Sequence, residues 1–174
     1  QIEANRNQFL LAIEFTKTQT HLAWLDLTTG TFAIASDNHH ENLTPLIESL
    51  APKEILIPEK SSATWTQPEN PWCDSFQYLE QNYTFTTIPD YHFDPIAGAR
   101  TTCDTLDVLN LNGFGISDQH PALGAAGAVL QYASETLCNT PANIKKVEEY
   151  KASENLLIDP ATLQNLEIFK SATN

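Results

Sequence analysis

Two acidic side chains stand where apolar runs of the sequence end, and their placement suggests divalent-metal chemistry. Glu14 closes the run QFLLAIEF (8–15), and Asp26 lies near the end of HLAWLDL (21–27). Carboxylates at the ends of neighbouring strands can hold the metal ions of a nuclease. That chemistry needs a tight cluster of acids, and the sequence offers no convincing third or fourth member. A metal-dependent nuclease is therefore the alternative hypothesis.

Other motifs with chemical potential have simpler explanations. The stretch GAAG (124–127) lacks the lysine of a phosphate-binding loop, so close packing explains it better. Adjacent histidines such as His39 and His40 tend to point apart and rarely bind one metal. The three cysteines are widely spaced without a CxxC pair, which is typical of reduced thiols in a cytosolic protein. We therefore predict no catalytic, cofactor or metal site in this chain.

The charge distribution argues against direct nucleic-acid binding. The chain has 22 acidic and 9 basic residues, and between Ser61 and Ile144 the only cation is Arg100. Binding to phosphates depends on clustered lysine and arginine. No signal peptide is visible, and no apolar run approaches the roughly 18 residues of a membrane span. We expect a cytoplasmic protein with little or no nucleic-acid or membrane contact.

Three antiparallel strands open the predicted fold, and helices and strands alternate after them. The strands are expected at 8–15, 21–27, 31–35, 54–58 and 83–88, and the helices at 44–50, 73–81, 94–108 and 121–137, with a polar loop at 61–72. This pattern predicts an α/β domain whose mixed sheet of about five strands is flanked by helices. Small residues at 124–128 would let the last helix approach the sheet closely.

This order of elements is that of the ribonuclease H-like fold, whose nucleases place metal-binding acids on the first and later strands. Fold alone does not establish function. Besides the nuclease, an unrelated α/β ligand-binding domain is a third hypothesis, which a deep apolar pocket with converging polar groups would favour.

The helix that begins at Asp94-Pro95 carries one interesting cation. We expect its buried stripe, packed on the sheet, to contain Ile96, Cys103 and Leu106 or their near neighbours. Arg100 and Thr101 fall off that stripe and should lie at the surface.

Six blocks that span nearly the whole chain follow one another in order: FLLAIEF, HLAWLDLTTGTF, LAPKEILIPE (50–59), GFGI (113–116), ALGAAGAVLQYASETL (122–137) and LLIDPATLQNLEIFKS (156–171). Together they resemble the MutS family of bacterial DNA mismatch-repair proteins. The resemblance implies a connector domain with a ribonuclease H-like fold and no nuclease activity. It links the mismatch-reading domain to the core, relays nucleotide-dependent rearrangement and offers a docking surface to MutL. ATP and magnesium are expected only in an ATPase domain that this chain lacks.

The resemblance also divides the chain. Residues 1–142 would form the connector, 143–155 a charged linker, and 156–174 the truncated start of the core (lever) domain. In the last segment Leu163, Leu166 and Phe169 make an apolar helix face without a partner in the chain. The sequence contains no methionine, so we expect a piece of a longer bacterial protein, associated with the nucleoid through that parent.

The partner-binding hypothesis comprises Ala97, Arg100, Thr101 and Asp104. Some of the family's contacts for MutL lie on this helix. Counting back from Gly113 without a gap, two adjacent glutamines of the family fall on Arg100 and Thr101, so this sequence departs from the family there. The alternative for Arg100 is a helix ion pair with Asp104, four residues on, worth a few tenths of a kcal/mol.

Overall fold

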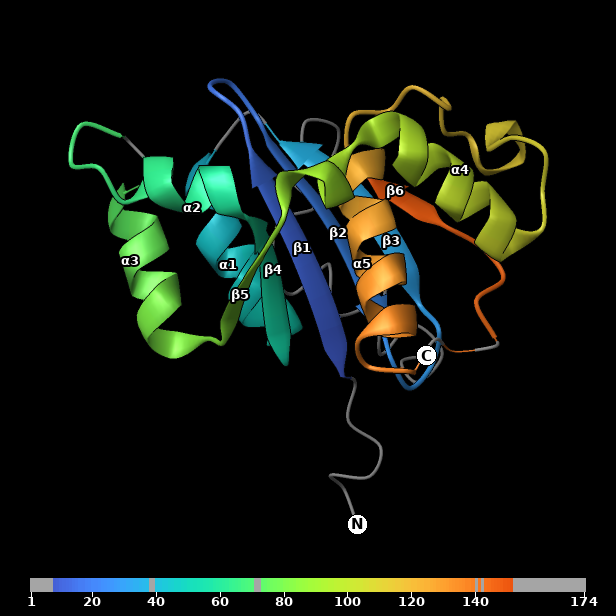
Figure 1. The fold of residues 1–174 in the computed structure, drawn as a ribbon, viewed down its shortest axis with the longest axis horizontal. Helices are drawn as coiled ribbons and strands as arrows, with labels where there is room; N and C mark the ends of the chain where they lie inside the picture. Colours follow the sequence, from blue (N-terminus) through green and yellow to red (C-terminus); the bar gives the residue numbers. More distant parts are fainter. Residues whose placement is uncertain (1–7, 38–39, 71–72, 140, 142, 152–174) are drawn as a thin grey trace, which may run out of the picture.

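A six-stranded mixed sheet forms the centre of the computed structural model, which describes residues 8–37, 40–70, 73–139, 141 and 143–151. The strands lie in the order β5-β4-β1-β2-β3-β6 (Figure 1). The first three pair antiparallel, whereas β4, β5 and β6 each run parallel to a neighbour. Their bounds are β1 Phe9–Phe15, β2 Thr20–Asp26, β3 Phe32–Asp37, β4 Glu54–Pro58, β5 Phe85–Ile88 and β6 Glu148–Tyr150. The mixed α/β class and the three antiparallel opening strands are confirmed, and the ribonuclease H-like assignment stays a prediction.

Helices occupy both faces of the sheet. Their bounds are α1 Leu43–Leu50, α2 Glu59–Trp65, α3 Cys73–Asn82, α4 Pro95–Leu106 and α5 Leu123–Glu135, with 3-10 segments η2 His40–Asn42, η3 Asp90–Phe93 and η4 Asn112–Phe114. Within the described ranges, no helix is both long and apolar enough to cross a membrane.

Alternation along the central strands creates two separate cores. In β1, Phe9, Leu11 and Ile13 belong to one buried cluster, while Leu10 and Ala12 belong to the other. Successive side chains of a strand point to opposite faces of the sheet. Because both rows are buried, the strand is covered on both sides, which explains the nearly continuous apolar run at its position.

Large side chains build the core under α1, α2 and α3. Trp24 of β2 lies in the same buried cluster as Trp65 of α2 and Phe76 of α3. The ring of Phe76 meets that of Phe85 edge-on, with 5.2 Å between ring centroids. Aromatic rings of this size contribute most of the apolar area in such a core.

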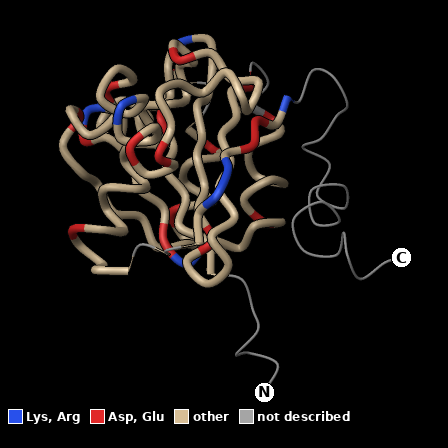
Figure 2. The backbone as a smooth tube through the Cα atoms, turned by 90° about the vertical axis from the view of Figure 1, so that its right-hand side faces the viewer, with Lys and Arg blue, Asp and Glu red and all other residues tan. Residues whose placement is uncertain are grey.

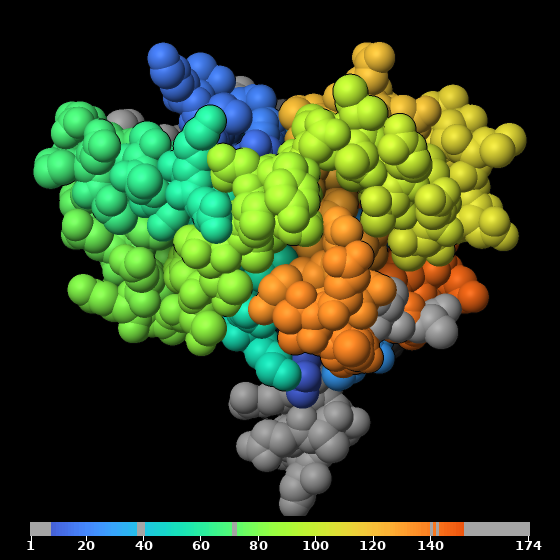
Figure 3. All heavy atoms as spheres, in the orientation of Figure 1, coloured from blue at the N-terminus to red at the C-terminus, as the bar shows by residue number. Residues whose placement is uncertain are grey.

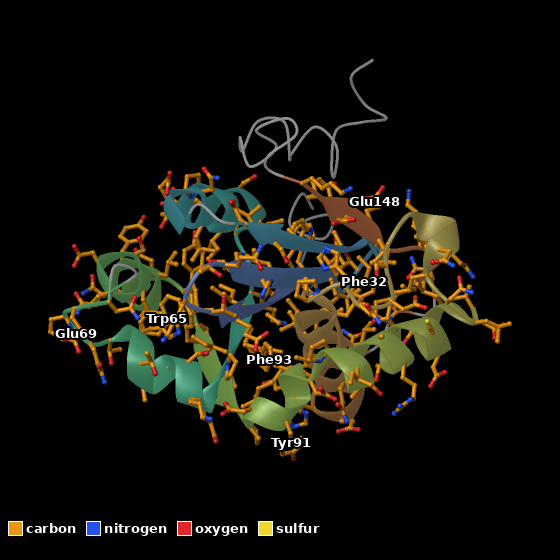
Figure 4. All side chains as sticks on the ribbon, turned by 90° about the horizontal axis from the view of Figure 1, so that it is seen from above. Phe32, Trp65, Glu69, Tyr91, Phe93 and Glu148 are labelled. Carbon is orange, nitrogen blue, oxygen red and sulfur yellow. The ribbon has the colours of Figure 1, made fainter. Side chains whose placement is uncertain are left out.

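The opposite face is covered in two steps. Helix α5 lies directly on β1 and β2, and α4 packs on α5, farther from the sheet (Figures 1 and 4). The two helices touch through glycines. A methyl group on Gly98 would overlap the Leu123 carbonyl, one on Gly124 would overlap the Phe93 carbonyl, and one on Gly127 would lie 2.7 Å from the Gly98 Cα. These glycines of α5 thus face α4 and η3, and the predicted close approach to the sheet is wrong for them.

The predicted antiparallel pairing of the second and third strands is confirmed, and Asp26 stabilises the turn between them. Gly30 has φ 84°, a conformation that glycine adopts without steric cost. The Oδ1 atom of Asp26 accepts hydrogen bonds from the backbone N–H groups of Thr28 (2.8 Å) and Gln8 (3.2 Å). The carboxylate therefore ties the turn to the chain entering β1.

The sheet has one more strand than predicted. Residues 143–155 were expected to form a charged linker, but in their described part β6 pairs parallel with β3, with Tyr150 opposite Ala35. Ile144, Val147 and Tyr150 are buried, so the linker prediction is wrong for this stretch. The sequence here was interpreted from its many glutamates and lysines, and the apolar residues between them were not recognised as a strand. Residues 156–174, the predicted start of a core domain, lie outside the described residues.

The segment predicted as a polar loop at 61–72 begins as a helix. Helix α2 ends at Trp65, whose side chain is buried in the core beneath it. One aromatic anchor stabilises a two-turn helix that periodicity alone does not reveal, because short helices depend on packing more than on propensity.

Candidate functional site

Helix α4 begins and ends at well-defined caps. The carboxylate of Asp94 accepts a hydrogen bond from the backbone N–H of Ala97 at 3.1 Å, and Pro95 occupies the first turn, as predicted. Asp107 ends the helix in the left-handed conformation, with φ 58°. The helix is therefore fixed at both ends.

The four predicted contact residues share the outward face of α4. Ala97, Arg100 and Asp104 are exposed and Thr101 is half-buried, while Gly98 and Thr102 are buried. Positions three, four and seven residues apart lie on one side of a helix. The structure thus brings the four residues together as one surface, which we call the α4 surface.

The buried stripe of α4 differs from the prediction. Ile96 is 72% exposed, and Cys103 and Leu106 are only half-buried. The prediction assumed that α4 lies on the sheet, but its neighbour is α5, which Gly98 contacts directly. Small residues line the interface because the backbones approach closely, while Cys103 and Leu106 pack partly buried against the core cluster of this face.

Exposed apolar side chains surround the α4 surface. Tyr91 is 73% and Leu109 is 99% exposed, in addition to Ile96. In Figure 4 Tyr91 lies at the outer edge of the molecule, whereas Phe93, two residues later, lies inside beneath the sheet. Exposed apolar residues that gather near one element are typical of interaction surfaces.

The charge around Arg100 is negative. Asp94, Asp104, Asp107 and Asp118 are the carboxylates of α4, its caps and the loop that follows it, and acidic positions are spread over much of the backbone in Figure 2. Burial, followed by the charges of Asp118 and Asp104, raises the pKa of the Cys103 thiol. In the described part of the chain, Arg100 forms no ion pair with Asp104. Its guanidinium group is therefore available to a partner.

A groove of about 330 Å³ runs beside this surface, between α4 and α5. It is lined by Thr101, Thr105, Leu130, Gln131, Ser134 and Glu135. The amide of Gln131 donates a hydrogen bond to Glu135 at 3.0 Å. The groove offers hydroxyl groups and one carboxylate to a side chain that enters next to Thr101.

The carboxylates of the nuclease hypothesis lie far apart. Glu14 pairs with His21, whereas Asp26 pairs with Phe9, at the other end of β1. Five residues of strand separate the two positions, or about 17 Å. Among the described residues, no group of three or more histidine, cysteine or acidic side chains could hold a metal ion.

Glu14 instead belongs to a polar row on the α5 side of the sheet. Burial, and then the charge of Asp90, raise its pKa to about 7. Burial, and then His120, lower the pKa of His21 to about 4, and Nδ1 of His21 lies 2.7 Å from Ser36 Oγ. Both groups are thus held largely neutral near pH 6, as expected where water is partly excluded.

Comparison with known families identifies the family of this chain. Residues 8–147 match the family model for MutS domain II. The chain belongs to this family. The match runs from the residue before β1 to the residue before β6, so it includes the α4 surface and the groove.

Relatives of this MutS domain II carry the name DNA mismatch repair protein MutS. The protein of Protochlamydia amoebophila is 31% identical over 152 residues, covering 86% of this chain and 17% of the relative. The protein of Thermodesulfovibrio yellowstonii is 32% identical over 165 residues, which cover 95% of this chain and 18% of the relative. The protein of Trichormus variabilis is 26% identical over 174 residues, which cover 96% of this chain and 20% of the relative. The chain spans about a fifth of the length of these curated relatives.

Two parts of the surface on this MutS domain II were missed from the sequence. The groove joins residues of α4 and α5 that lie about 30 positions apart, and Tyr91 had no assigned role. The small residues of both helices were the available signal. Gly98 in one predicted helix and Gly124 and Gly127 in the other are compatible with direct helix–helix contact.

Proposed function

We propose that this MutS domain II is a non-catalytic connector of a mismatch-repair protein. It links the mismatch-reading domain to the core and ATPase domains, relays nucleotide-dependent rearrangement between them and docks a MutL-like partner on the α4 surface. The observation that carries the docking proposal is the outward face of α4, where Arg100 is exposed without an ion pair in the described part, beside exposed Ile96 and Tyr91.

The packing of the domain supports the relay role. A body transmits displacement only if it does not deform, and tightly packed cores are not continuously deformable. Helix α4 contacts α5 through backbone atoms, and α5 lies on β1 and β2. A force on α4 therefore reaches α5 through backbone contact and passes from α5 to the sheet through the buried side chains of that face.

The docking surface fits a partner with both an apolar and an acidic element. Ile96 and Tyr91 supply apolar area, and Arg100 can orient a carboxylate. Opposite charges of this kind chiefly raise the association rate and fix the orientation of the partner. The groove at Thr101 and Glu135 can receive a hydrogen-bond donor from the same partner.

The remaining expectations concern chemistry located elsewhere in the parent protein. We expect no nuclease or ATPase activity from this chain, no cofactor of its own and little or no direct DNA binding. ATP and magnesium would act in the ATPase domain, and the parent would work in the bacterial cytoplasm at the nucleoid. The separation of about 17 Å between Glu14 and Asp26 along the strands supports the expectation that the chain has no nuclease activity.

Titration against the cognate MutL tests the docking surface. Arg100→Glu should reduce affinity by about 1–2 kcal/mol, a loss consistent with a useful but non-central contact. Lys53→Glu is the matched control, because it makes the same charge change at an exposed lysine before β4. The melting temperatures of both variants should stay close to that of the unmodified chain.

Equal affinities for the Arg100→Glu variant and the unmodified chain would move the docking site elsewhere. An equal loss in both variants would indicate a general charge effect. The non-catalytic assignment has its own test. Micromolar, salt-sensitive binding to duplex DNA, or Mg²⁺-dependent cleavage lost in Glu14→Ala, would contradict it.

A further inference from the structure

A pocket of about 340 Å³ opens between the turn after β1 and helix α2. In Figure 1 this turn projects beside α2, while α4 lies at the other end of the molecule. Figure 3 shows the atoms of the turn and of α2 side by side along the upper edge. The pocket is thus separate from the docking surface, and its role does not depend on the proposed function.

The inner wall of the pocket is aromatic and rigid. Phe15, the last residue of β1, and Trp65, the last residue of α2, both line it. Their rings contact each other and belong to the buried core, with 8% and 3% of each residue exposed. A wall that is part of the core keeps its shape whether or not a ligand is present.

The rim of the pocket is polar and carries positive charge. Its members are Thr16, Lys17, Lys60, Ser61, Thr64 and Asn70. Two hydroxyl groups are already used, since Thr16 donates to the Gln19 carbonyl and Thr64 to the Lys60 carbonyl. None of the lining residues is acidic. The carboxylate of Asp90, outside the lining, accepts a hydrogen bond from the backbone N–H of Lys60 at 3.0 Å.

The positive charge of this rim contrasts with the net negative charge of the whole chain. The chain has 22 acidic and 9 basic residues, yet two of the nine cations meet at one pocket. Neither Lys17 nor Lys60 forms an ion pair within the described residues, whereas Lys146 and Lys151 pair with glutamates at 3.3 and 3.9 Å. Two lysines that line one pocket without ion-pair partners favour an anionic ligand there.

We propose that this pocket binds a small organic anion, with a phosphate or carboxylate group held by Lys17 and Lys60 and a planar ring against Phe15 and Trp65. The volume lies at the lower end of the range for ligand pockets, which limits the ligand to about the size of a mononucleotide. Lysine binds either anion as a compact point charge, and an aromatic wall favours a flat apolar body.

Nuclear magnetic resonance titration of the ¹⁵N-labelled chain tests the proposal. The probes are adenosine 5′-monophosphate, benzoate, adenosine and inorganic phosphate, each up to about 10 mM, a range that detects weak binding. We expect adenosine monophosphate or benzoate to shift amides of residues 15–17 and 60–65 saturably. Adenosine and phosphate alone should bind about tenfold more weakly, because each lacks half of the recognition. A preference for one anionic probe identifies the phosphate or the carboxylate.

Charge variants make the test specific. Lys17→Gln with Lys60→Gln should weaken binding about tenfold, whereas Lys53→Gln, at an exposed lysine outside the pocket, should leave it within about twofold. Unshifted resonances elsewhere would confirm that the fold is intact. No saturable shift with either anionic ring probe would overturn the proposal. Equal loss in Lys53→Gln, or phosphate alone binding as tightly as adenosine monophosphate, would also overturn it.

Discussion

The helices on the two sides of the sheet are held by different kinds of contact. On one face, α1, α2 and α3 meet the strands through large side chains such as Trp24, Trp65 and Phe76. On the other face, α4 and α5 meet each other through Gly98, Gly124 and neighbouring backbone atoms. Side chains can change rotamer when a neighbour changes size, but backbones in contact cannot.

This difference concerns function as well as stability. The α4 surface stands on the backbone contact, so the position of Arg100 is determined by glycines that no partner touches. The pocket at Lys17 and Lys60 stands on the aromatic packing of Phe15 and Trp65. A substitution in the α4–α5 contact should therefore lower the stability of the domain more than one in the aromatic core on the other side of the sheet.

The largest effect should come from Gly98→Ala. The added methyl group would overlap the Leu123 carbonyl, so α4 would have to separate from α5. We expect a loss of at least about 3 kcal/mol of unfolding free energy, measured by chemical denaturation. Gly113→Ala is the control, since nothing lies within 4 Å of the site of its methyl group. Similar small losses for both variants would mean that the helices adapt.

A smaller effect is expected on the aromatic face. Phe76 is 1% exposed and packs against Phe85 and other large side chains. Phe76→Leu keeps an apolar residue there, and its neighbours can partly fill the space, so we expect a loss of about 1.5 kcal/mol. The same denaturation experiment measures it. A loss as large as that for Gly98→Ala would remove the contrast between the two faces.

Glu14 provides a pH-dependent test on the α5 side. Burial, then Asp90, raise its pKa from 4.5 to about 7, so the folded chain retains a proton that the unfolded chain releases between those values. The stability contributed by this group therefore falls as pH rises from 4.5 to 7. Glu14→Gln should stabilise the domain by about 1 kcal/mol near pH 8, after allowing for water at this half-exposed site, and hardly at all near pH 4. His21 titrates in the opposite sense, but it is present in both proteins and cancels in the comparison. A constant difference across this range would show that Glu14 is not held neutral.

Arg100 should have the smallest effect on stability. It is exposed and forms no ion pair with Asp104 in the described part of the chain. Arg100→Ala should change the unfolding free energy by less than about 0.5 kcal/mol. A larger change would mean that Arg100 supports the fold, and its effect on partner binding would then be indirect.

Local signals predicted the parts of the fold that depend on neighbouring residues. Asp94 and Pro95 indicated the start of α4, and the apolar runs at 21–27 and 31–35 indicated the antiparallel strands β2 and β3. Burial of β1 on both of its faces follows from its nearly continuous apolar run. The exposure of Arg100 was also predicted, because its position on the helix face is set by helical periodicity.

The errors concern contacts made across long sequence distances. Ile96 was expected in the buried stripe of α4 but is exposed, and Cys103 and Leu106 are only partly buried, because glycines, which hydropathy does not weigh, set the position of α4. The prediction of a charged linker missed strand β6 because glutamates and lysines surround the buried residues Val147 and Tyr150. The pocket at Lys17 and Lys60 joins residues more than 40 positions apart, and no local pattern marks it.

The parallel pairing of β6 with β3 has a consequence for the growing chain on the ribosome. More than a hundred residues separate Asp37 from Glu148. The edge of β3 that pairs with β6 therefore stays unpaired while α1 to α5 are being synthesised. At about 5–20 residues per second the wait lasts roughly 5 to 20 s. An unpaired strand can capture a strand from another molecule during that time. The interval before Tyr150 emerges is therefore when this domain most needs protection by a chaperone or by slow initiation of neighbouring chains.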